Sequence, residues 1–213
     1  MLFRSDPSGD FWIQAESMDG QVQRVVAGPA ALGQWLPSVW AAWLTLLSCV
    51  FLHGSWLHLI ANIWVLHVFG DNVEERMGRL RYLAFYLAAG LGASLAHWWS
   101  DPDSAVPTVG ASGSIAGVMG AYLVLFPTAR VLTWIPFLLV VVVPLPAILF
   151  LSGWLAMQIF HGMVESSVVD GVAWWAHIGG FVFGMVGTIV LRVLGALRPA
   201  VPRSEEHTSE LQS

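Results

Sequence analysis

The segment TVGASGSIAGVMGAYL (residues 108–123) decides the fold of this chain of 213 residues. It is apolar enough to enter a bilayer, yet it carries the hydroxyls of Thr108, Ser112 and Ser114 in its first half. Its glycines recur at helical spacing, at Gly113, Gly117 and Gly120. Because faces of small residues let membrane helices approach closely, the pattern predicts a membrane helix that packs tightly against a partner.

The composition indicates a membrane protein. Hydrophobic residues make up 56% of the chain and charged residues 11%, with a mean hydropathy of +0.68, whereas soluble domains carry about 25% charged residues. The net charge of −5 is too small and too scattered to favour a nucleic-acid partner. The single cysteine, Cys49, cannot form a disulfide within the chain.

Five apolar spans are expected. Crossing a bilayer takes about 20 residues, and the candidate segments lie at about 55–70, 82–99, 112–126, 145–163 and 173–195. The charged segment 71–81 and the polar segments 100–110 and 164–171 are interpreted as loops. We therefore expect an all-α fold, a polytopic bundle of membrane helices.

The arginines orient these spans. They follow the first, third and fifth spans, at Arg76, Arg79, Arg81, Arg130, Arg192 and Arg198. Loops rich in positive charge stay on the cytoplasmic side of a membrane. Ser112 and His177 therefore belong at the outer ends of their spans, where the two can meet.

Ser112 has two interpretations. A serine in the first turn of a helix can cap backbone N–H groups, and for this residue alone that is the simpler interpretation. The same position also places a hydroxyl at the positive end of the helix dipole, which favours an oxyanion or an alkoxide nucleophile.

His177 also has two interpretations. In the sequence AHIGGFVFG, His177 shares one helix face with Gly180 and Gly184. If this face packs on the glycines of the 112–126 span, His177 comes close to Ser112. The imidazole is then either the general base that a serine nucleophile needs or a hydrogen-bonding group that only joins two spans, and the residues alone leave both open.

The sequence HGSWLHLIAN adds polar groups to the first span. His58 and Asn62 are four residues apart and share a helix face, so their side chains could stabilise the negative oxygen of a tetrahedral intermediate. A metal is not expected, because HExxH is absent and the spans hold no carboxylate to join the histidines. A haem-binding membrane cytochrome was also considered, but the CxxCH attachment motif is absent, and no cofactor is expected.

Taken together, these motifs resemble the rhomboid family of intramembrane serine proteases. The resemblance rests on GASG at the start of a Gly-rich span, HxxxxHxxxN in an earlier span and AHxGGxxxG in the last. It implies that Ser112 is the nucleophile and His177 the base of a Ser–His dyad without an Asp. It also implies an oxyanion hole made by His58, Asn62 and the backbone N–H of Ser112.

The resemblance assigns further roles. His53, Gly110 and Gly113 would support the site, and Ser114 falls outside the motif as a packing or capping hydroxyl. The loop at 164–172 would cover the site. Substrates would be single-span proteins in the lipid bilayer, cut near the outer face of a bacterial inner membrane. The alternative is an inactive rhomboid-like protein that binds membrane clients.

The expected organisation has five parts. The rhomboid-like membrane domain covers 44–195, with a partial outer loop at 6–43 and a short cytoplasmic tail at 196–202. Residues 1–5 and 203–213 resemble translated sequencing adapter. Since the family core has six spans and five are found, we expect the chain to be a fragment that lacks the first span.

Overall fold

The computed structural model describes residues 2–5, 11–16, 22–27, 48–100, 110–135, 141–164 and 172–199. Within these residues the chain forms five long helices, one short 3₁₀ helix and two small sheets. The helices are η1 (Cys49–Phe51), α3 (Trp56–Met77), α4 (Arg79–Ser100), α5 (Ser112–Leu125), α6 (Ala147–Val164) and α7 (Trp174–Val193). The fold is therefore mostly helical, as the sequence predicts.

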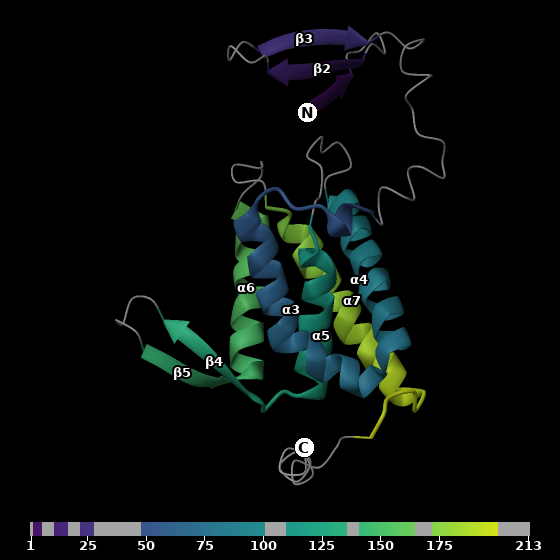
Figure 1. Ribbon diagram of the computed structural model, residues 1–213, viewed down its shortest axis with the longest axis vertical. Helices are drawn as coiled ribbons and strands as arrows, with labels where there is room; N and C mark the ends of the chain where they lie inside the picture. Colours follow the sequence, from purple (N-terminus) through teal and green to yellow (C-terminus); the bar gives the residue numbers. More distant parts are fainter. Residues whose placement is uncertain are drawn as a thin grey trace.

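Helix α5 forms the centre of the bundle. It lies among the other four long helices and packs most extensively against α7 (Figure 1). Every residue from Gly113 to Tyr122 is buried. A helix that is apolar all round and enclosed by protein needs no polar face, which explains why this segment shows no amphipathic pattern.

The outer surface of the bundle is strongly apolar. Large hydrophobic side chains point outward along the helices, among them Trp64 on α3, Phe160 on α6 and Val193 on α7. A continuous apolar surface of this kind does not suit a monomer in water and marks contact with lipid or protein. By length and composition, α6 and α7 qualify as membrane-spanning helices among the described residues, and α5 is a shorter apolar helix.

The helix boundaries follow the expected spans with one difference. Helix α3 ends at Met77 and α4 begins at Arg79, so the segment 71–81, which the sequence predicts to be a loop, is helical except at Gly78. Gly78 has a φ of 80°, a left-handed conformation that favours glycine at a helix end. The residues before it are compatible with a helix, so the real turn between α3 and α4 is much shorter than the predicted loop at 71–81.

Two small antiparallel sheets depart from the all-α expectation. Strands β1 (Leu2–Ser5), β2 (Phe11–Glu16) and β3 (Val22–Ala27) pair in that order. Strands β4 (Arg130–Ile135) and β5 (Val141–Pro146) form a hairpin, in which Arg130 lies opposite Pro146.

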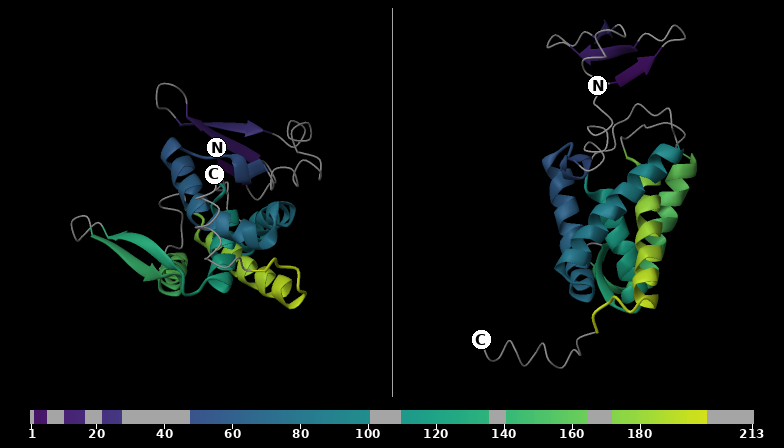
Figure 2. Two further views of the ribbon diagram at one scale, coloured as in Figure 1. Left: turned by 60° about the horizontal axis from the view of Figure 1, so that its bottom comes forward. Right: turned by 90° about the vertical axis from the view of Figure 1, so that its right-hand side faces the viewer.

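The second hairpin has a clear cause in the sequence. Residues 141–143 are three consecutive valines, which favour strands, and Pro144 and Pro146 exclude a helix interior. The fourth helix therefore begins only at Ala147. The hairpin projects sideways from the bundle beside α6 (Figures 1 and 2).

Several expectations fall partly or wholly outside the described residues. These are the adapter-like segment 203–213, most of the partial outer loop at 6–43, most of the loop at 100–110, residues 165–171 of the loop expected to cover the site, and residues 200–202 of the expected tail.

Candidate active site

Main-chain contact between α5 and α7 brings the two predicted catalytic residues together. A Cβ atom added at Gly180 would collide with the carbonyl of Gly113, and one added at Gly184 would collide with the carbonyl of Gly117. On α5, a Cβ at Gly120 would collide with the carbonyl of Phe181. The two glycine faces pack directly on each other, as their spacing predicts.

Ser112 and His177 meet at one end of this contact, which we call the site end. The Ser112 Oγ lies 2.9 Å from the His177 Nε2. Ser112 is the first residue of α5, and the helix cap is Ala111, which makes no side-chain capping bond. The Ser112 hydroxyl is thus paired with the imidazole across two helices, which is not the capping arrangement that the residue alone favoured.

Gln158 on α6 is the third member of this group. Its Oε1 lies 2.7 Å from the His177 Nδ1, and the residue is only 4% exposed. An amide oxygen only accepts hydrogen bonds, so Nδ1 carries the proton that is donated to Gln158. In neutral imidazole the other nitrogen, Nε2, is then the acceptor for the Ser112 hydroxyl.

Gln158 was missed in the sequence. It lies within an apolar span, and a polar side chain in such a position is expected to bond inside the protein or to line a functional site. The polarity of Gln158 within an apolar span could therefore be seen in the sequence. However, the sequence does not reveal which neighbouring helix the amide faces.

Aromatic side chains surround the imidazole on its other sides. The His177 ring lies 6.0 Å from the Trp154 ring and 6.4 Å from the Trp174 ring, between ring centres. Trp174 in turn stacks on His161 at 4.6 Å. Bulky rings on both sides restrict the rotation of the imidazole and leave it only partly exposed.

The predicted oxyanion-hole residues lie close to the start of α5. Gly110 has a φ of 112°, and a Cβ added there would lie 2.8 Å from His58 Cε1 and 3.8 Å from Asn62 Nδ2. Asn62 is 8% exposed and donates one amide hydrogen to the His58 carbonyl at 3.0 Å. An Asn amide has two hydrogens, so one remains for another acceptor.

The neighbouring residues have structural contacts. The Gly110 N–H donates to the Cys49 carbonyl at 2.9 Å, which ties the loop before α5 to η1. His53 packs edge-on against His58, with 5.2 Å between ring centres. At Gly113, a Cβ would lie 2.6 Å from the Cβ of Ala93 on α4.

Comparison with known proteins gives the family. Residues 40–193 match the sequence model of the Rhomboid domain. This chain belongs to the rhomboid family.

Several curated proteins with rhomboid in their names are similar to this chain in sequence. The rhomboid chain is 28% identical over 172 residues to presenilin-associated rhomboid-like protein A, mitochondrial, of Danio rerio, covering 77% of this chain and 39% of that protein. It is 41% identical over 81 residues to rhomboid protease GluP of Bacillus subtilis, covering 38% of this chain and 15% of that protein. It is 42% identical over 78 residues to RHOMBOID-like protein 5 of Arabidopsis thaliana, covering 37% of this chain and 25% of that protein. The chain thus spans well under half the length of these relatives.

Membership of the rhomboid family implies a polytopic integral membrane protein, in agreement with the apolar outer surface. In the rhomboid chain, the structure brings Ser112, His177, His58, Asn62 and Gly110 to one end of the bundle. Ser114 is different. It is 1% exposed and its hydroxyl faces Gly90 of α4, so it takes no part in the pairing with His177.

Proposed function

We propose that this rhomboid chain carries the catalytic site of an intramembrane serine endopeptidase. The observation that supports it is the ordered contact from the Ser112 hydroxyl to His177 and from His177 to Gln158. A serine hydroxyl is a weak nucleophile until a base takes its proton, and a base needs a third group to fix its orientation. All three groups are present, on three different helices.

The first step would form the acyl-enzyme. As the Ser112 Oγ attacks the carbonyl carbon of the scissile peptide bond, its proton passes to Nε2 of His177. The carbonyl π electrons move to oxygen and give a tetrahedral oxyanion. When the C–N bond breaks, the imidazolium returns the proton to the leaving amine. A water molecule then repeats the sequence and releases the acyl group, which regenerates Ser112.

Gln158 would replace the carboxylate of a triad. Its amide oxygen accepts the Nδ1 proton, so it holds the productive tautomer and orients the ring. Because the amide is neutral, it stabilises the imidazolium less than an aspartate would. It also avoids a buried carboxylate in an apolar bundle, which would be costly.

The oxyanion would be stabilised from α3 and from the start of α5. The free amide hydrogen of Asn62 and the His58 ring lie next to Gly110, and the first N–H groups of a helix lack intrahelical partners. Donors arranged in advance around a developing charge are a major source of catalytic power, and loss of one costs about 100- to 1,000-fold in rate.

The substrates would be single-span membrane proteins, cut near the outer face of a bacterial inner membrane. Within the described part of the chain, the end of the bundle opposite Ser112 carries six arginines, at Arg76, Arg79, Arg81, Arg130, Arg192 and Arg198. This asymmetry supports an outward-facing site. A dry apolar bundle does not supply the water that hydrolysis needs, so a site near a membrane surface suits the reaction.

A fluorophosphonate probe tests the proposal, because it reacts with an activated serine. In lipid vesicles, the probe should label Ser112. Labelling should vanish in Ser112→Ala and fall at least 100-fold in His177→Ala. Ser114→Ala is the matched control, since Ser114 lies two residues away and faces α4; it should keep most of the labelling.

Two results would contradict the proposal. Equal labelling of wild type and His177→Ala would remove the base role of the histidine. An unreactive wild type would favour the inactive rhomboid-like alternative.

A further inference from the structure

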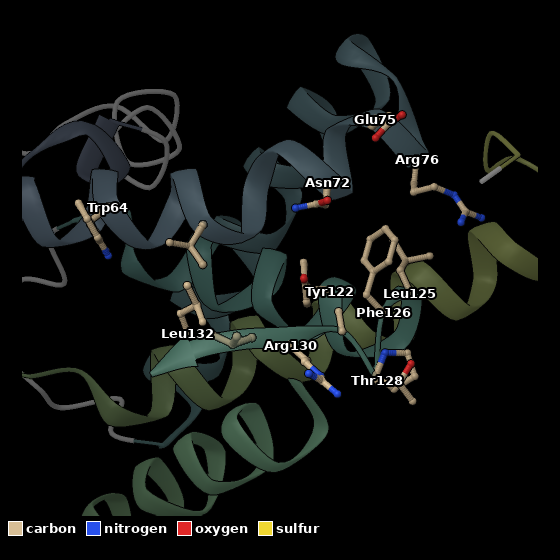
Figure 3. Close-up of a pocket in the computed structure, with 14 residues that line it drawn as sticks. Trp64, Asn72, Glu75, Arg76, Tyr122, Leu125, Phe126, Thr128, Arg130 and Leu132 are labelled. Carbon is tan, nitrogen blue, oxygen red and sulfur yellow. The ribbon is translucent and has the colours of Figure 1, made fainter. Parts of the chain in front are cut away.

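A large cavity lies at the other end of the bundle, which we call the Arg-bearing end. Its volume is about 910 Å³, and it lies between α3, the last turn of α5 and strand β4 (Figure 3). Helix α5 separates it from Ser112 by about 20 Å, at 1.5 Å per residue. We call this space the hairpin cavity, because β4 of the hairpin forms one wall.

The hairpin cavity has an apolar half and a polar half. Trp64, Val68 and Leu132 line the apolar half, and Trp64 and Leu132 are 70% and 75% exposed. The polar half is lined by Asn72, Glu75, Arg76, Thr128 and Arg130, with the apolar side chains of Leu125 and Phe126 among them. Trp64 and Leu132 lie toward one end of the space, and Glu75, Arg76 and Thr128 lie toward the other (Figure 3).

The floor of the cavity is rigid. The turn after α5 is tied to the first residues of α6 by two backbone bonds, from the Ala147 N–H to the Ala129 carbonyl at 2.7 Å and from the Ile148 N–H to the Pro127 carbonyl at 2.9 Å. The cavity is therefore present before any ligand arrives, so a ligand would not have to order this turn on binding.

Strand β5 is suited to the boundary between lipid and water. Residues two apart in a strand direct their N–H groups to the same side, and the ladder with β4 is continuous at both Pro144 and Pro146. The N–H groups that Pro144 and Pro146 lack are therefore the ones that would point to the outer edge of the hairpin, away from β4. An edge with fewer orphan N–H groups is less costly to bring against lipid.

We propose that the hairpin cavity binds one glycerophospholipid from the leaflet at the Arg-bearing end. An acyl chain lies against Trp64, Val68 and Leu132, and the phosphate binds at Arg130. Arginine side chains recognise phosphate through charge-assisted hydrogen bonds, and basic pockets between membrane helices bind lipid headgroups.

Other occupants fit less well. Water alone does not suit the half lined by Trp64 and Leu132, because these large apolar side chains are exposed on a surface that faces lipid. The apolar half is open to the outer surface of the bundle, because Trp64 and Leu132 are themselves largely exposed. A phospholipid of the surrounding bilayer combines the two groups that the cavity requires, apolar acyl chains and a charged phosphate.

Native mass spectrometry tests the proposal. The protein is released from vesicles that contain phosphatidylcholine, phosphatidylethanolamine or phosphatidylglycerol, each mixed with diacylglycerol, and the retained lipid is identified and counted. We expect one retained phospholipid per chain. Arg130→Gln, which removes the phosphate contact, and Leu132→Trp, which fills the apolar half, should each lower retention about tenfold.

Two matched variants serve as controls. Arg79→Gln removes an arginine at the same end whose side chain is 93% exposed and does not line this cavity. Leu149→Trp places the same bulk on α6, at a residue that is 62% exposed. Both should retain lipid as the wild type does.

The comparison of lipids distinguishes the sources of binding. Retention of any of the three phospholipids that depends on Arg130 supports recognition of the shared phosphate. Equal retention of diacylglycerol, or equal retention in Arg130→Gln and wild type, would overturn it. Ser112→Ala should keep the bound lipid, so failure of the protease proposal leaves this result unchanged.

Discussion

The two ends of the helix bundle differ in the hydrogen bonds that their side chains make. At the site end, two bonds join side chain to side chain, from Ser112 to His177 and on to Gln158, beside the bond from Asn62 to the His58 carbonyl. At the Arg-bearing end, arginines donate to backbone carbonyls. Arg81 bonds to the Ala196 carbonyl at 2.6 Å and Arg192 to the Val124 carbonyl at 2.8 Å.

This difference indicates that the site end determines the reactivity of the protein, whereas the Arg-bearing end contributes to its stability. Arginine is always charged. Arg192 satisfies a carbonyl in the last turn of α5, which the helix end leaves unpaired, and Arg81 satisfies a carbonyl in the segment after α7. Serine and histidine can exchange a proton, so their pairing is chemically competent. Substitutions at the site end should therefore change reactivity, whereas those at the Arg-bearing end should change stability.

The largest effect is expected from Gly184→Val, which breaks the contact that aligns the site end. A Cβ there collides with the Gly117 carbonyl, so α5 and α7 must move apart. A displacement of 1 Å can cost about 100-fold in rate, and fluorophosphonate labelling of Ser112 should fall at least that much. Gly153→Ala is the control, because a Cβ at Gly153 on α6 meets nothing within 4 Å. Equal labelling in both variants would contradict the role of the glycine contact.

An intermediate effect is expected from Gln158→Leu. It removes the acceptor for the His177 Nδ1 proton while keeping an apolar side chain of similar size. The loss of one such bond should lower labelling of Ser112 about 10- to 100-fold. Gln158→Glu should restore much of it, because a carboxylate accepts the same proton. If both variants lost labelling equally while helical content stayed unchanged, Gln158 would have only a packing role.

The smallest effect on chemistry is expected from Arg81→Gln. It removes the bond to the Ala196 carbonyl and should lower the free energy of unfolding by about 1 kcal/mol, measured by following helical ellipticity during unfolding in sodium dodecyl sulfate. Labelling of Ser112 in the folded protein should be unchanged. A fall in labelling without a fall in stability would show that the two ends are coupled.

The sequence predicts much of this structure. The helical spacing of the glycines is enough to predict that α5 packs on α7, because it shows which residues share one face of each helix. The start of α5 at Ser112 and the extents of α6 and α7 agree with the expected spans to within about two residues.

Other features could not be obtained in this way. The hairpin of β4 and β5 was missed because the fourth span was placed at 145–163 and no element was assigned to the residues before it, although their valines and prolines favour a strand. Gln158 was missed because hydrophobic periodicity carries no information about the rotation of α6 around its axis. Its contact with His177 depends on tertiary packing. The hairpin cavity arises from segments separated along the chain, so no local pattern reveals it.

The glycine contact between α5 and α7 also limits how far the two helices that carry the reacting groups can move relative to each other. Helices that pack through long side chains can shift against each other as rotamers exchange. Here the spacing is set by main-chain atoms of Gly117 and Gly184, which have no rotamers. The spacing of the backbones that carry Ser112 and His177 is therefore insensitive to side-chain rotamers at this contact, even in a fluid bilayer.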